Sequence, residues 1–163
     1  MYAKFFFMKS HTLTFQFLAQ PTDVNFGGKV HGGTVMTWID QTGYACARNW
    51  AGSYCVTVYV GGIKFYKAIH IGEIVRVDAT ILHTGSTSMH MVVEVFSKPI
   101  EADDFVKKTQ CIIVFVAVDA KGKPTAVPKW TPETEVQKKL EQYVLKLKKA
   151  REEMIDELEV YLP

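Results

Sequence analysis

The sequence lacks most features that mark membrane, secreted or metal-binding proteins. No apolar run in the 163 residues approaches the roughly 18 that a membrane-spanning helix needs. The chain has only three cysteines, and these show neither a Cys-x-x-Cys pair nor metal-ligand spacing: Cys46, Cys55 and Cys111. We therefore predict reduced, buried thiols in a cytoplasmic protein that has no metal site, no cofactor and no membrane partner.

A strong excess of one charge is missing as well. The 19 basic and 17 acidic residues leave a net charge of +2, which argues against a nucleic-acid partner. There is no Gly-x-Ser-x-Gly elbow, which argues against a serine hydrolase. Apolar residues make up 48% of the chain, enough for one domain with a sizeable core.

What the sequence does contain is a long apolar helix among five strand-like segments. The helix is expected at residues 32–50, after a loop at 21–29. Alternating or β-branched patterns predict strands at 11–19, 54–66, 73–83, 87–97 and 107–119. Because the helix is apolar on nearly every side, it needs sheet around it. We predict an α+β fold with an antiparallel five-stranded sheet wrapped around a long central helix.

Two details of this sheet follow from local signals. Gly61-Gly62 inside a strand pattern indicates a bulge or a close backbone approach. A single curled sheet also leaves an open edge, and such an edge favours dimerisation through a continuous sheet.

The end of the chain predicts a helical extension, residues 131–163, after a domain of residues 1–130. Thr131 suits the N-cap and Pro132 the first helical turn. Apolar residues recur at helical spacing and charges of both signs fill the other faces. This amphipathic helix should pack on the body of the protein or on a partner chain.

Asp40 is the strongest chemical signal, because it is a lone carboxylate inside the apolar helix. A buried charge costs free energy unless it is paired or hydrogen-bonded. Burial also suits a carboxylate to act as a base or a nucleophile. From the residues alone, a structural aspartate capped by local hydroxyls or amides is an equal alternative.

The segment Asn25-Phe26-Gly27-Gly28-Lys29-Val30-His31-Gly32-Gly33, with Asp40 seven residues further on, resembles the hotdog-fold acyl-CoA thioesterases. The nearest likeness is to the bacterial broad-specificity and the brain-type cytosolic acyl-CoA hydrolases, and it covers residues 11–128. The resemblance implies a hotdog fold and hydrolysis of acyl-CoA to fatty acid and coenzyme A. It also implies a homodimer with shared active sites, assembled into a hexamer as a trimer of dimers.

The resemblance also implies a role for each matching residue. Asp40 becomes the general base or nucleophile, and Asn25 positions the water or the thioester carbonyl. The backbone amide near Gly33 becomes the oxyanion contact, with His31 beside it. The grip on coenzyme A is assigned to Thr57, Gly85, Ser86, Thr87 and Ser88.

The residue chemistry fits these roles, although a purely structural role is an alternative for several of the residues. A helix N-terminus offers unpaired N–H groups at its positive end, and a loop rich in hydroxyls suits a pantetheine or phosphate. Without the motif, Asn25 is better explained as a plain turn residue, and the loop at 84–88 is alternatively an ordinary hairpin turn. Lys107, with Lys98 and Lys108, either meets the nucleotide phosphates or forms a solvated edge.

Helix geometry adds one inference. Gly33 and Asp40 are seven residues apart, roughly 10 Å along a helix. One carbonyl carbon cannot lie close to both, so the two groups of one helix should serve different sites. A two-fold partner would supply the missing half of each site.

Two other functions compete with the thioesterase. One is a non-catalytic acyl-CoA or lipid-binding module on the same fold, against which the intact Asn25 and Asp40 argue. The other is a hotdog dehydratase or hydratase, whose pairing of histidine and acid we do not recognise in this chain.

Overall fold

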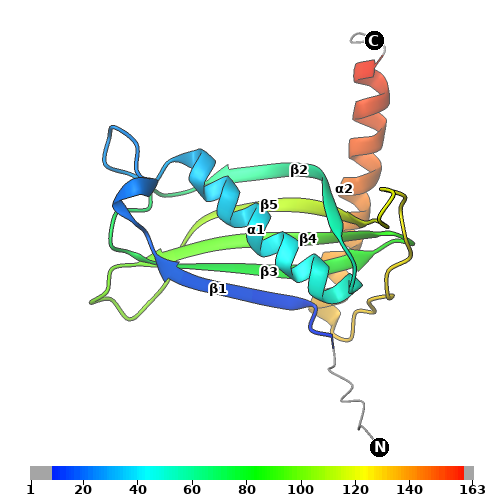
Figure 1. The fold of residues 1–163 in the computed structure, drawn as a ribbon, viewed down its shortest axis with the longest axis horizontal. Coiled ribbons are helices and arrows are strands. Elements are labelled where there is room, and N and C mark those ends of the chain that lie inside the picture. Colours follow the sequence, from blue (N-terminus) through cyan, green and yellow to red (C-terminus); the bar gives the residue numbers. More distant parts are fainter. Residues whose placement is uncertain (1–8, 160–163) are drawn as a thin grey trace, which may run out of the picture.

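The computed structural model describes residues 9–159, which form one five-stranded sheet and two long helices (Figure 1). The elements are β1 (Thr12–Leu18), a 3-10 turn (Pro21–Asp23), α1 (Gly32–Ala51), β2 (Cys55–Phe65), β3 (Ile74–Thr84), β4 (Ser88–Lys98), β5 (Val106–Ala117) and α2 (Glu135–Glu159). The strand order is β1-β3-β4-β5-β2, and all neighbours are antiparallel. The predicted α+β fold and its five strands are confirmed.

The core lies between α1 and the face of the sheet that it crosses. The alternate residues of β3 that point to this face are fully buried: Val75, Val77, Ala79 and Ile81. Alternation places every second side chain of a strand on the same face, so this pattern was readable from the sequence. Ile39, Cys46 and Ala47 supply the helix side of the same core.

In the single chain α1 is buried on one face only. Its buried residues recur at helical spacing from Val35 to Trp50, whereas Thr37, Gln41 and Arg48 are exposed. The expectation that the helix is buried on nearly every side is therefore wrong for one chain. The sheet is a single layer, and a single layer covers one side of a helix.

β2 is the edge strand beside α1, and it carries the irregularity that its glycines predicted. The register shifts once between Thr57 and Tyr59 and again between Gly61 and Lys64. Gly62 has φ 62°, a conformation that L side chains rarely adopt. A Cβ on Gly61 would overlap the Tyr59 ring, so a larger residue there would displace that ring.

α2 crosses the outer face of the sheet, opposite α1 (Figure 1). His83 Nδ1 of β3 lies 2.8 Å from Glu141 Oε1, and the Arg151 guanidinium lies 4.3 Å from the centre of the Tyr59 ring on β2. Val144 is buried between these two contacts. The prediction that this helix packs on the body is confirmed.

The predicted start of this helix is wrong. α2 begins at Glu135, four residues after Thr131. Thr134 Oγ1 accepts a hydrogen bond from the backbone N–H of Gln137, and Gln137 Oε1 accepts from the N–H of Glu133 and of Thr134. This reciprocal capping satisfies several N–H groups at once, which explains why it outcompetes Thr131.

The three cysteines are free and buried, as predicted: Cys46, Cys55 and Cys111. No helix in residues 9–159 is long and apolar enough to cross a membrane.

A buried histidine beneath α2 makes stability depend on pH. Burial, and then the nearby charges of His83, Arg151 and Lys148, lower the pKa of His90 from 6.5 to about 4. The unfolded chain therefore takes up the proton first as the pH falls. We expect His90 to lower the free energy of unfolding by about 3 kcal/mol between pH 6.5 and 4, and to contribute no pH dependence above that window.

Urea denaturation at pH 7, 5.5 and 4 tests this expectation. Carboxylates also titrate near pH 4, so the informative quantity is the difference between the parent and His90→Gln. The variant should lose less stability on acidification; parallel pH profiles for the two proteins would show that His90 is not responsible.

Candidate active site

Asp40 lies in the middle of α1, on the side that faces β2. Its Oδ1 accepts a hydrogen bond of 2.7 Å from the Thr57 hydroxyl. Asp40 is half-buried and Thr57 is exposed. The carboxylate is thus oriented by one protein hydrogen bond, and part of it faces solvent. A group that acts on a substrate needs both this orientation and this access.

The geometry of the α1–β2 connection explains why these two residues meet. From Asp40 to the end of α1 at Ala51 the helix rises roughly 16 Å. Gly52 then ends the helix with φ 75°, its N–H donating to the Arg48 carbonyl, and the chain turns back. A strand covers roughly 16 Å in five residues, which returns the chain to Asp40 near Thr57.

The Cys111 thiol on β5 is the other reactive group near Asp40. Cys111 is 1% exposed. Burial, and then the negative charge of Asp40, raise the pKa of Cys111 to about 12. Because the thiolate is the nucleophilic form, Cys111 is inert at neutral pH. Asp40 is therefore the stronger candidate for chemistry here.

The start of α1 carries a second group of polar atoms. His31 is the N-cap, and its Nδ1 accepts a 3.4 Å hydrogen bond from the Gly33 N–H. Asn25 Oδ1 accepts from the backbone N–H of Gly27 at 2.9 Å and of Lys29 at 3.4 Å. Asn25 thus shapes its loop through its side-chain oxygen.

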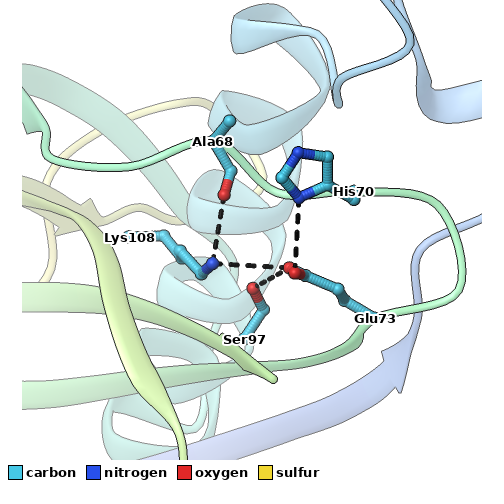
Figure 2. Close-up of polar contacts among 5 residues, drawn as sticks. All are labelled: Ala68, His70, Glu73, Ser97 and Lys108. Atoms are coloured by element: carbon cyan, nitrogen blue, oxygen red, sulfur yellow. Dashed lines mark hydrogen bonds and ion pairs between the residues drawn. The ribbon is translucent and has the colours of Figure 1, made fainter. Parts of the chain in front are cut away.

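A buried polar cluster supports the segment that leads to the start of α1 (Figure 2). Glu73, 8% exposed, accepts a hydrogen bond from Ser97 and lies 3.5 Å from the Lys108 ammonium. Lys108, 7% exposed, also donates to the Ala68 carbonyl at 3.1 Å. His70 Nδ1 lies 3.4 Å from the other carboxylate oxygen of Glu73.

This cluster is linked to α1 by backbone hydrogen bonds. The Val30 N–H donates to the Ile69 carbonyl at 2.9 Å, and Lys29 and His70 form an isolated bridge. Burial alone would raise the pKa of Glu73, but hydrogen bonds from Ser97 and the His70 backbone, with the Lys108 charge, lower it. Glu73 is therefore a carboxylate at neutral pH, and the ion pair fixes the loop before α1.

The remaining candidates lie in two separate places. The loop at 85–88 joins β3 to β4 at the Thr57 end of the sheet, because Met89 pairs with Phe115 and Phe115 with Thr57. Lys107 pairs with Phe96, eight residues along β5 and roughly 26 Å from that end. The structure therefore does not bring Lys107 and the loop to one ligand within a single chain.

Lys98, Lys107 and Lys108 were expected either to meet the nucleotide phosphates or to form a solvated edge. Neither expectation describes Lys98 or Lys108. The Lys108 ammonium is buried against Glu73, and Lys98 donates to the Ala102 carbonyl at 2.7 Å. Lys107 forms a 2.5 Å ion pair with Glu94 at a half-exposed position. Lys107 and Lys108 differ because neighbouring residues of a strand point to opposite faces.

Comparison with known proteins assigns the family. The Thioesterase superfamily model matches residues 27–102. The acyl-CoA thioester hydrolase YciA of Escherichia coli is 34% identical over 119 residues, which cover 71% of this chain and 90% of that protein. The chain belongs to the thioesterase superfamily.

Two solved structures resemble this superfamily member over nearly its whole length. An apo-hexameric acyl-CoA thioesterase has a TM-score of 0.84 and 30% identity, covering 89% of this chain and 93% of its own. The Staphylococcus aureus acyl-CoA hydrolase, solved with butyryl coenzyme A and coenzyme A, has a TM-score of 0.83 and 28% identity, covering 93% and 94%.

The Staphylococcus aureus enzyme has also been solved as three single variants, in which alanine replaces an asparagine, an aspartate or a threonine. The aspartate follows the asparagine by 15 residues, and the threonine follows the aspartate by 17. Asn25, Asp40 and Thr57 of this superfamily member have the same spacing. The contact of Thr57 with Asp40 was not predicted from the sequence, because it depends on β2 returning alongside α1. In residues 9–159 no three His, Cys, Asp or Glu side chains form a group suited to a metal ion.

Proposed function

We propose that Asp40 is the catalytic carboxylate of an acyl-CoA thioester hydrolase that releases a fatty acid and coenzyme A. The observation that carries the proposal is the Thr57-oriented carboxylate on a helix whose first turn offers a backbone N–H. Because the two groups of one helix are too far apart to act on the same carbonyl, one helix from each subunit would supply the two things a thioester needs: a base or nucleophile, and a donor for the oxygen. The family named above fits this chemistry.

The reaction can proceed from Asp40 in two ways. As a base, Asp40 removes a proton from water while the water oxygen bonds to the thioester carbon; the carbon–sulfur bond then breaks and the thiolate takes up the proton. As a nucleophile, Asp40 bonds to that carbon, coenzyme A leaves, and water hydrolyses the anhydride. In both routes an N–H such as that of Gly33 stabilises the charged oxygen.

A panel of acyl-CoA substrates, read with a thiol dye, tests the proposed activity. Release of free coenzyme A supports hydrolysis and also reports the preferred acyl chain length. A non-catalytic binding module or a hydratase would release no thiol, so a panel without signal would refute the proposal.

Single turnover in water enriched in oxygen-18 detects the covalent route. Label in the Asp40 side chain arises only when water attacks the aspartyl carbonyl of the anhydride, and the base route cannot place it there.

For the assembly we propose a homodimer through the open edge of β2, with active sites shared across the two-fold axis, and a trimer of such dimers. Val58 and Val60 are 55% and 37% exposed along that edge. The relative named above is hexameric.

Sharing of the active sites would bring the α1 start, with Asn25, His31 and Gly33, to the Asp40 of the partner. The loop at 85–88 and Lys107, far apart in one chain, would then hold coenzyme A from different subunits. Three free thiols suit a cytoplasmic protein.

Mixing two inactive variants should restore activity if the sites are shared. Asp40→Asn removes the carboxylate, and Gly33→Pro removes the N–H at a position in the first helical turn where proline is tolerated. A mixed dimer would then hold one site with both lesions and one intact site. We expect up to half the parent activity per mixed dimer, measured by thiol release after the two chains are folded together.

Gly33→Ala is the matched control, because it keeps the N–H and its added Cβ would meet only the His31 ring, at 3.8 Å. It should remain active by itself. If the mixture of Asp40→Asn and Gly33→Pro stays inactive although mixed dimers are present, each site is built within one chain.

Thr57→Val should reduce kcat about 10-fold, because the carboxylate loses the hydroxyl that orients it. Thr57→Ser keeps the hydroxyl and should retain most of the activity. Thr57 is exposed, so the melting temperature should change little in either variant. Equal kcat values for the valine and serine variants would show that the hydrogen bond does not matter for turnover.

A further inference from the structure

α2 is longer than the sheet that it crosses. Its contacts on β3 and β2, at Glu141 and Arg151, are ten helical steps apart, roughly 15 Å of helix. Three strand spacings separate β3 from β2, which amounts to roughly 14 Å. The helix therefore runs almost perpendicular to the strands and reaches the edge strand at Arg151.

The last turns of α2 continue past that edge (Figure 1). From Arg151 to Glu159 the helix extends roughly 12 Å more, about two and a half strand spacings. Met154 and Ile155 in this part are 70% and 43% exposed. β2 is the last strand on this side, so this chain has no sheet beneath them.

The charges of the same region are divided between its two halves. Residues 146–151 include four bases, and residues 152–159 include five acids. The bases are Lys146, Lys148, Lys149 and Arg151, and the acids are Glu152, Glu153, Asp156, Glu157 and Glu159. A second copy of the helix in antiparallel orientation places its acids opposite these bases. The sequence is thus complementary to itself under a two-fold axis.

We propose that the C-terminal halves of two α2 helices pack against each other, antiparallel, across the seam of the dimer. This inference rests on the β2 edge dimer proposed above. The seam would lie half a strand spacing beyond β2, so the axis would pass α2 near residues 152–153. Val58 and Val60, two of the exposed apolar residues of the edge, flank Tyr59 beneath Arg151, so part of the apolar edge lies at the level of α2.

This axis and the helix periodicity specify the contacts. Lys146, Ala150, Met154 and Glu157 are exposed on one side of the helix, so Lys146 faces Glu157 of the second copy and Met154 faces Ala150. Glu152 and Glu153, the acids nearest the axis, are paired with lysines of their own helix, Lys148 at 3.5 Å and Lys149 at 3.9 Å. These pairs reduce the repulsion between the two copies. The contact therefore combines apolar burial with charge pairing on the outer face of the joined sheets.

A charge exchange between Lys146 and Glu157 tests the contact in the full-length chain. Lys146→Glu alone, or Glu157→Lys alone, places like charges opposite each other twice in every dimer. A dimer of one chain of each kind has opposite charges at both places. The two variants, distinguished by mass, are expressed together, and native mass spectrometry counts self and mixed dimers.

We expect mixed dimers to exceed the statistical ratio roughly 5-fold or more. The double variant, with both exchanges in one chain, should pair with itself as well as the parent does. Loss of an ion pair within one helix cannot be repaired by a second chain, so this pattern separates contact between chains from stabilisation within one.

A statistical mixture of self and mixed dimers would overturn the proposal, as would a double variant that dimerises no better than the single ones. Thiol release from the same preparations reports the proposed function separately. A parent that hydrolyses acyl-CoA but sediments as a monomer would overturn this contact and leave the hydrolase assignment intact.

Discussion

Replacing Asp40 with asparagine should reduce thiol release from acyl-CoA at least ~100-fold, since the reaction loses its base or nucleophile. The substitution preserves size, and the Thr57 hydroxyl can still donate to the remaining side-chain oxygen. The fold should therefore survive, with a melting temperature close to that of the parent. Initial rates at saturating substrate, together with circular dichroism, measure both effects.

Gln41→Ala is the matched control for this substitution. Gln41 is the next residue of the same helix and is exposed, so its loss should leave the rate within a factor of two. A folded Asp40→Asn protein with most of its activity would remove Asp40 from the chemistry and make it the structural aspartate that the sequence also allowed.

Lys108→Met should be the most destabilising of the substitutions considered. It leaves the Glu73 carboxylate buried without its cation and the Ala68 carbonyl without its side-chain donor. Breaking a buried ion pair by removing one partner typically costs 3–5 kcal/mol, so we expect a loss of about that size in the free energy of unfolding. Urea denaturation at pH 7 measures the loss.

Lys107→Met is the control, because Lys107 is the preceding residue but pairs with Glu94 near the surface, where their side chains are 35% and 32% exposed. Partly exposed pairs contribute about 1 kcal/mol or less. The double variant Glu73→Gln, Lys108→Met should recover part of the loss, since no uncompensated charge then remains buried. Equal losses for the two single lysine variants would show that the buried pair contributes no more than a surface pair.

Local patterns in the sequence were sufficient for most elements. β3 was predictable because Val75, Val77, Ala79 and Ile81 alternate with polar residues, and alternation follows directly from strand geometry. The bulge in β2 was predictable because Gly62 needs a positive φ. The start of α2 was not, since Thr131 and Thr134 are both good caps and the choice depended on the reciprocal hydrogen bonds of Gln137.

The candidate site divides in the same way. Asp40 could be singled out because a charge in an apolar helix costs free energy wherever the helix packs. Its partner Thr57 could not, because that contact forms only when β2 returns alongside α1. Lys107 and Lys108 read alike in the sequence, and only the pairing of β5 with its neighbours placed one near the surface and the other in the core.

The sequence by itself therefore determined the class of fold, the family and the candidate carboxylate, because periodicity and an isolated charge are local properties of a chain. The tertiary structure decided which groups meet: Thr57 with Asp40, Lys108 with Glu73, and α2 with the outer face of the sheet. Such contacts depend on where strands and helices far apart in the chain come together, and no local pattern encodes that distance.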